Sequence, residues 1–175
     1  MHLVLPSVEY KKSFIEAVRE FQEEEPNETT RRYFKYSVPE FEANFDTYVQ
    51  ELKAETLGLG LPVGYVPNTL YWLTDGDEYI GRVTVRHRLN EHLESIGGHI
   101  GYDIRPSRRK QGYGSKILEL ALPKAKELGI KRVLITCDET NLGSRRVIEK
   151  NGGVFENKVP NPETGIDKLR YWITL

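Results

Sequence analysis

The sequence has a single cysteine, Cys137, among its 175 residues. One cysteine can form neither a disulfide framework within the chain nor a cysteine-based zinc cluster. No apolar run approaches the roughly 20 residues of a membrane-spanning helix, and the first residues lack the layout of a signal peptide. Excess charge is also missing: the formal net charge is −1, which gives no global reason to expect nucleic acid or a membrane surface as partner. The lack of these features predicts a cytoplasmic protein.

What is present is the composition of a globular protein, with 38% hydrophobic and 29% charged residues. A chain of this length suits one domain with a sizeable core, and we expect that domain to span residues 1–175. Apolar spacing and turn residues predict helices at 8–24, 39–57, 90–95, 115–128 and 141–150, and strands at 2–5, 69–74, 79–87, 99–104, 131–137, 154–156 and 169–175. This order predicts an α/β (α+β) fold with a mixed central sheet. Pro123, inside a helix, predicts a kink near residues 119–122.

The most informative stretch runs from Ile104 to Ser115, where an apolar strand is followed by a basic, glycine-rich turn and then by a helix. The first N–H groups of a helix lack intrahelical acceptors and lie at the positive end of its dipole. Glycines let a backbone approach a pyrophosphate closely. The order of elements therefore predicts a site for a phosphorylated ligand, although a tight turn with exposed basic residues would have the same local pattern.

Two other phosphate-binding motifs do not fit this stretch. A P-loop ends in Gly-Lys-(Ser or Thr), whereas Gly114-Ser115 has no lysine between glycine and serine. A dinucleotide-binding fold needs Gly-x-Gly-x-x-Gly soon after its first strand, and that region has no such motif.

The pattern that does fit is (Arg or Gln)-x-x-Gly-x-(Gly or Ala), matched by residues Arg109 to Gly114. A second segment, Asn141-x-x-Ser144 continuing to Gly152, is similar to Asn-x-x-(Ala or Ser)-x-x-x-Tyr-x-Lys-x-Gly. With these two motifs in this order, residues 98–155 resemble the GCN5-related N-acetyltransferases (GNAT family). The chain looks most like a subgroup of predicted acetyltransferases whose substrate is undefined.

The resemblance implies that acetyl-coenzyme A donates an acetyl group to a primary amine of a small molecule or peptide by direct attack, with no metal. It also implies a GNAT-like sheet of about seven strands, flanked by about four helices. One strand pair, residues 99–104 and 131–137, should splay to admit the thioester. Dimers are common in the family, so a homodimer is among the states to expect. The implied cofactor-binding residues are Ile104, Arg105, Arg109, Lys110, Gln111, Gly112, Tyr113, Gly114, Ser115, Asn141 and Ser144.

The proton chemistry is less well defined. Ile148 stands where the family often has a proton-donating tyrosine, which leaves a non-catalytic acyl-coenzyme A-binding module as the alternative function. Catalytic candidates are His99, Tyr102 and Asp103; His99 suits a general base, and equally a structural histidine. Strand alternation puts His99 and Asp103 on one face and Tyr102 on the other, unless a bulge exchanges them. The spacing of His87, His99 and Asp103 matches no recognised metal-ligand pattern.

Overall fold

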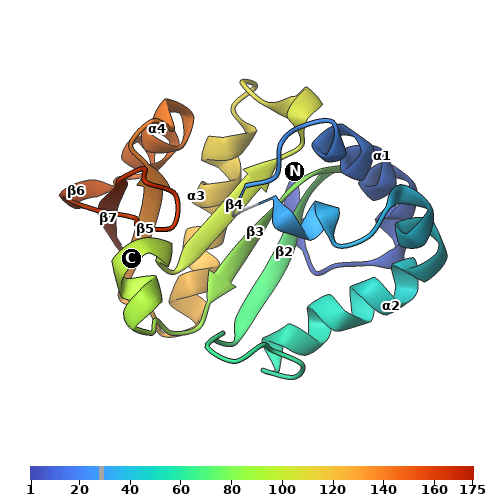
Figure 1. Ribbon diagram of the computed structural model, residues 1–175, viewed down its shortest axis with the longest axis horizontal. Helices are drawn as coiled ribbons and strands as arrows, with labels where there is room; N and C mark the ends of the chain where they lie inside the picture. The colour runs from blue at the N-terminus through green and yellow to red at the C-terminus, as the bar shows by residue number, and fades with distance from the viewer. Residues whose placement is uncertain (28–29) are drawn as a thin grey trace.

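The computed structural model describes residues 1–27 and 30–175 of the chain. Within these residues, seven strands form two sheets: the first has the order β1-β2-β3-β4 and the second the order β5-β7-β6 (Figure 1). All the pairs within each sheet are antiparallel. The strands are β1 (His2–Val4), β2 (Asn68–Asp75), β3 (Glu78–Arg86), β4 (Ile100–Ile104), β5 (Arg132–Asp138), β6 (Val154–Val159) and β7 (Lys168–Thr174). The predicted α/β class is confirmed.

In the described part of the chain, four α-helices surround the sheets: α1 (Lys11–Gln22), α2 (Val38–Thr56), α3 (Tyr113–Glu127) and α4 (Leu142–Lys150). Shorter helical turns are η1 (Val8–Tyr10), η2 (Arg31–Phe34), η3 (Leu93–Gly97) and η4 (Pro106–Arg108). Two helical segments begin with a side-chain cap, because the Ser7 and Asn141 side chains accept the N–H groups of Glu9 and Ser144. Among the described residues, no helix is long and apolar enough to cross a membrane.

The kink predicted near residues 119–122 does not interrupt α3, which is continuous with Pro123 inside it. Pro123 is exposed, so water can hydrate the carbonyl group that the missing N–H leaves without a donor. The irregularity lies instead in α2, at Asn44, whose φ of −112° and ψ of 19° are not helical. The Asn44 side chain donates to the carbonyl of Glu40 there, and so competes with the helix backbone.

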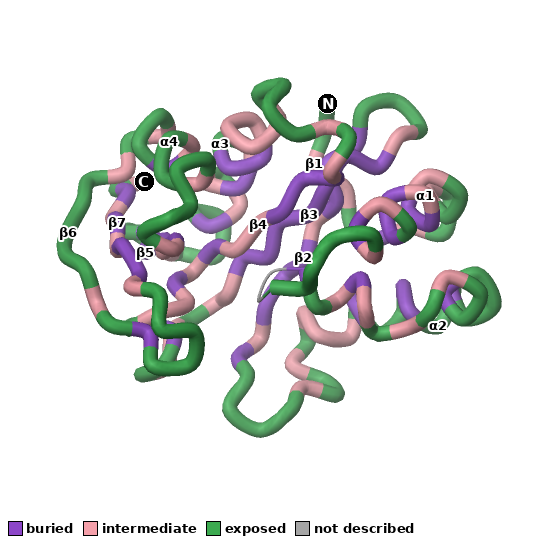
Figure 2. The backbone as a smooth tube through the Cα atoms, turned by 45° about the horizontal axis from the view of Figure 1, so that its top comes forward, coloured by how far each residue is buried: buried purple, intermediate pink, exposed green. Residues whose placement is uncertain are grey.

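Two cores of different composition lie in the molecule, and the strands between them are the most deeply buried (Figure 2). The aliphatic core joins α3 and α4 to strands of both sheets, and Tyr171 is its one fully buried aromatic residue among those described. The aromatic core lies under α1 and α2. Its buried rings are Phe14, Phe21, Tyr33, Phe41, Phe45, Tyr48, Trp72 and Tyr79.

Strand β4 contributes to the aliphatic core through Ile100 and Ile104.

Candidate active site

The two sheets meet where β4 and β5 lie side by side, and these strands are joined at one end only. The N–H of His99 donates to the carbonyl of Leu134 at 2.7 Å, and the N–H of Leu134 donates to Nδ1 of the His99 ring at 3.0 Å. Gly98 has a φ of 65°, and a Cβ there would lie 2.5 Å from the carbonyl oxygen of Leu134. Only glycine therefore permits so close an approach. We call this junction the closed end.

Beyond it the strands belong to separate sheets, and β4 is an edge strand. Here the Tyr102 hydroxyl, on β4, lies 3.0 Å from Oγ of Ser144, on α4. We call this region, where β4 and β5 are not paired, the open end. Burial raises the pKa of Tyr102 well above its ordinary value, and burial raises the pKa of Cys137, on β5, to about 11. Both groups therefore carry their protons at neutral pH.

The glycine-rich turn forms the start of α3. Lys110 has a φ of 60°, the one positive value among the described residues other than glycine. Gly112 has a φ of 88° and, without a side chain, supplies no side-chain cap to the helix. Consecutive N–H groups at such a turn, together with the positive helix end, suit an anion. A Cβ at Gly114 would lie 3.1 Å from Cγ2 of Val147, so this glycine brings α3 close to α4.

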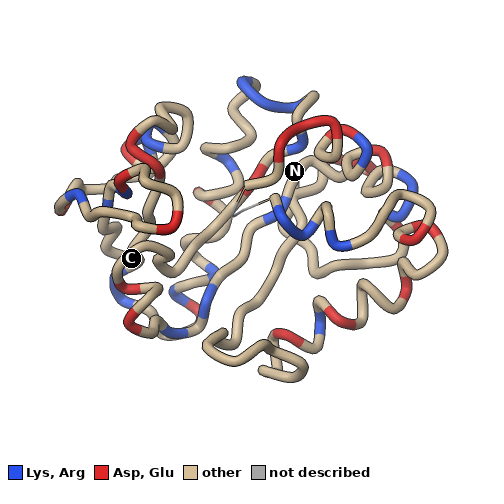
Figure 3. The backbone as a smooth tube through the Cα atoms, viewed as in Figure 1, with Lys and Arg blue, Asp and Glu red and all other residues tan. Residues whose placement is uncertain are grey.

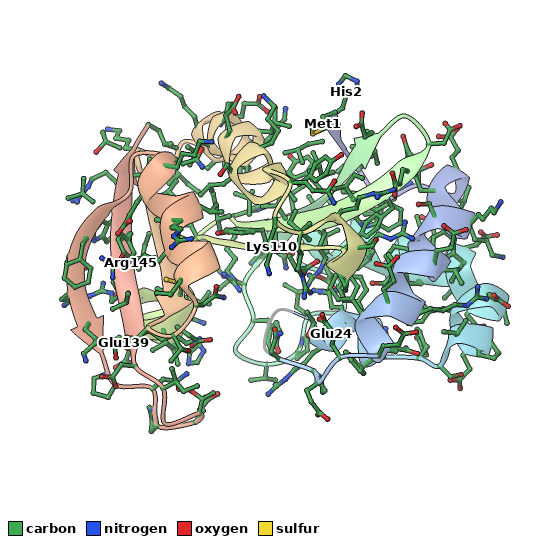
Figure 4. All side chains as sticks on the ribbon, turned by 90° about the horizontal axis from the view of Figure 1, so that it is seen from above. Met1, His2, Glu24, Lys110, Glu139 and Arg145 are labelled. Atoms are coloured by element: carbon green, nitrogen blue, oxygen red, sulfur yellow. The ribbon has the colours of Figure 1, made fainter. Side chains whose placement is uncertain are left out.

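The arginines of the turn are already paired with carboxylates. Arg105 is 8% exposed, and its guanidinium contacts Glu20 at 2.7 Å and Glu78 at 3.4 Å. The Arg109 guanidinium contacts both carboxylate oxygens of Glu24, at 2.7 and 2.9 Å. In Figure 3, a basic segment before α3 lies near the acidic segment at the end of α1. From above, the exposed Lys110 lies between Glu24 and Arg145, which is on α4 (Figure 4).

The other predicted cofactor residues have local partners. The side-chain amide of Gln111 donates to the carbonyl of Ser107 at 3.1 Å. The carbonyl of Ser115 accepts from the Asn151 side chain at 3.2 Å. Asn141 caps α4 through the N–H of Ser144 at 2.9 Å. The structure therefore brings the two sequence motifs together: the turn and α4 flank the same open end.

Two of the catalytic candidates have partners that favour positioning roles. Because Nδ1 of His99 accepts a hydrogen bond, the neutral ring carries its hydrogen on Nε2 and has no free basic nitrogen. Burial, with Arg86 nearby, lowers the pKa of His99. Asp103 lies on the aromatic side, where Tyr33 donates to it and Arg82 lies 2.8 Å away. Burial raises the pKa of Asp103, which Arg82 opposes. The β4 register is continuous, so the predicted alternation holds.

The sequence model described as an acetyltransferase (GNAT) domain matches residues 14–154. The chain belongs to the GNAT family. A relative, the uncharacterized N-acetyltransferase YnaD of Bacillus subtilis (strain 168), is 29% identical over 106 residues, which span 58% of this chain and 60% of that protein.

Three solved structures have a similar fold. RimL, a ribosomal L7/L12 alpha-N-protein acetyltransferase in complex with coenzyme A, has a TM-score of 0.71 at 18% identity, over 99% of this chain and 93% of that one. RimJ of Mycobacterium smegmatis has a TM-score of 0.71 at 19% identity, over 98% and 80% of the two chains. The acetyltransferase MccE, in complex with acetyl-coenzyme A and AMP, has a TM-score of 0.69 at 12% identity, over 99% and 91%.

Sequence patterns did not indicate the carboxylates that hold the GNAT turn. Glu20 lies inside the predicted first helix, residues 8–24, and Glu24 is its last predicted residue. Both contact residues more than 80 positions away, and no local pattern encodes such a pairing. Among the described residues, no group of three or more histidine, cysteine or acidic side chains is placed to hold a metal ion.

Proposed function

We propose that this GNAT protein transfers an acetyl group from acetyl-coenzyme A to a primary amine of a small molecule or peptide. The observation that carries the proposal is the open end, bordered by an edge strand on one side and by the uncapped start of α3 on the other. The coenzyme A and acetyl-coenzyme A in the complexes of related folds support this choice of co-substrate. The action of RimL on a protein α-amino group supports an amine acceptor.

The residues present fit such a co-substrate. The first N–H groups of α3, following Gly112, would hold a pyrophosphate group, and Lys110 would add positive charge. Backbone groups on the free edge of β4 would line a pantetheine arm. The co-substrate itself supplies an acyl group activated as a thioester. Ser144, a residue of the second motif, lies beside this region and would border the same arm.

We further propose that Tyr102, bonded to Ser144, holds the proton for the leaving thiol group. Ile148, at the position of the family tyrosine, is fully buried in the aliphatic core and has no proton to give. The Tyr102 hydroxyl is on β4, and it keeps its proton at neutral pH because burial raises its pKa. His99 and Asp103 stay predictions as catalytic groups, and their contacts favour holding β4 in place.

Binding of coenzyme A tests the proposal first. A ligand at about 100 times its dissociation constant should stabilise the fold by roughly 2.7 kcal/mol, seen as a rise in melting temperature. Gly112→Trp should abolish that rise. Gly76→Trp is the matched control, because Gly76 also has a positive φ and open space around it but lies in the β2–β3 turn. Failure of the unchanged protein to bind coenzyme A would refute the proposal.

Turnover is tested separately, with a panel of primary amines and peptides and detection of free thiol. We expect acetyl-coenzyme A to release thiol only when an accepted amine is present. Binding without release across the whole panel would instead support the alternative, an acyl-coenzyme A-binding module without activity.

A further inference from the structure

The acidic end of α1 contacts the glycine-rich turn at two points that differ in exposure. Glu20 lies in α1, and Glu24 lies in the turn that follows it, four residues later. This spacing puts both carboxylates on one side of the helix axis, toward residues 105–109. The contact at Glu20 is half-buried, whereas the contact at Glu24 is open to solvent.

Glu20 is tied into the backbone at the entry of the turn. It accepts the N–H of Ser107 at 3.0 Å, the hydroxyl of Ser107 at 3.0 Å and Nε of Arg105 at 2.7 Å. Although burial alone raises the pKa of Glu20, the hydrogen bonds from Ser107 and Arg105 lower it overall, so the carboxylate stays charged. Since the Arg105 side chain is itself 9% exposed, this group is fixed in place.

Glu24 makes a different kind of contact. Its two oxygens meet the two terminal nitrogens of Arg109, and both side chains are 40% exposed. The guanidinium has the same fork geometry toward a carboxylate and toward a phosphate. Its Nε donates to the carbonyl of Ile104 at 3.0 Å, and it lies over the ring of Phe21. These contacts keep the guanidinium in place whichever anion occupies its outer nitrogens.

We propose that Glu24 competes with a phosphate group for the outer nitrogens of Arg109, and leaves them when a phosphorylated ligand binds. On the same account, Glu20 is a positioning residue that holds the turn in its binding shape. The inference rests on the proposed function, because the ligand is the phosphate portion of coenzyme A. Glu24 then weakens cofactor binding and Glu20 strengthens it, although both are carboxylates bonded to arginines of one turn.

Calorimetric titration with coenzyme A separates the two roles. Glu24→Gln should lower the dissociation constant about two- to fivefold, the strength of an exposed ion pair. In an Arg109→Gln background the same change should have no effect, since the coupling is then absent. Glu42→Gln is the matched control: it removes another exposed pair, with Arg19, between α1 and α2, and should leave the constant unchanged.

Glu20→Gln and Ser107→Ala should both raise the KM for acetyl-coenzyme A with kcat unchanged. A loss of folded protein alone would lower the apparent kcat and leave KM as it was. The proposal is overturned if Glu24→Gln leaves affinity unchanged or weakens it, if it tightens binding equally without Arg109, or if the Glu20 and Ser107 variants leave KM unaltered. If the unchanged protein fails to bind coenzyme A, the proposed function fails as well, so the two failures are distinguishable.

Discussion

The closed and open ends of the β4–β5 pair are only a few residues apart and are built in opposite ways. At the closed end, His99 and Leu134 form two hydrogen bonds and Gly98 touches the β5 backbone. At the open end, the contact is between two side-chain hydroxyls, of Tyr102 and Ser144. Strands that approach so closely at one point could continue as a ladder. Their separation is therefore a built feature of the fold, suited to a ligand that enters between them.

The largest expected effect comes from forcing the closed end apart. Gly98→Ala should destabilise the fold by about 3 kcal/mol, combining the cost of a positive φ with overpacking against Leu134. Gly60→Ala is the control, because Gly60 has a similar φ of 69° with no atom within 4 Å, and it should cost about 1–2 kcal/mol. Urea denaturation measures both variants. Equal losses would mean that the close approach at Gly98 does not hold the strands together.

A substitution at the open end should lower the rate of acetyl transfer and leave the stability of the fold unchanged. Tyr102→Phe should lower kcat about 100-fold, at the low end for general acid catalysis, while coenzyme A affinity changes less than about twofold. Steady-state kinetics measures the rate and calorimetry the affinity. Tyr71→Phe, on β2 and also partly buried, should keep full activity. A Tyr102→Phe enzyme as fast as the unchanged one would remove Tyr102 from the proton chemistry.

Asp103 is buried on the opposite face of β4, and its contacts test what holds this strand in place at the open end. If β4 is held at the open end by the aromatic core and not by β5, then Tyr33→Phe should cost about 1–3 kcal/mol, because an oxygen of Asp103 loses its donor. Thermal denaturation should show no such loss for Tyr65→Phe, whose ring is exposed. No loss in the Tyr33 variant would mean that this bond does not stabilise β4.

The smallest effect concerns pH at the closed end. The folded pKa of His99 is lowered by burial, so the unfolded chain binds the proton more readily. Stability is therefore complete above the ordinary pKa of about 6.5 and is lost as pH falls through the lower folded pKa. His99→Asn can still accept from Leu134 but cannot titrate. Between about pH 7.5 and 5.5 its stability should fall less than that of the unchanged protein; parallel curves would contradict this role.

Local patterns predicted most of the fold because the relevant residues are neighbours in the sequence. The apolar spacing at Phe14, Val18 and Phe21 places the buried face of α1, and the helix predicted at 141–150 corresponds to α4. The alternation along β4 also holds. The limits of elements were harder to predict: η3 is a π-helix ending at Gly97, and β6 continues to Val159, three residues beyond the expected end.

The site was predictable only as far as its motifs extend. The glycine-rich turn and the Asn141 segment indicated which two elements meet. The contact between Tyr102 and Ser144 joins residues 42 positions apart, and the partners of Arg105 and Arg109 lie in α1. Such contacts depend on how the layers pack. Sequence alone therefore predicted basic residues at the turn, but not that two of the arginines form ion pairs with Glu20 and Glu24.

Amide hydrogen exchange with and without saturating coenzyme A tests whether the cofactor binds at the open end while the closed end stays bonded, because it reports on both ends at once. The account predicts slower exchange at residues 101–104 and 112–116 when coenzyme A is bound. The N–H groups of His99 and Leu134, already bonded across the closed end, should exchange slowly in both states. Protection that leaves these open-end segments unchanged, or that appears only elsewhere on the chain, would contradict the account.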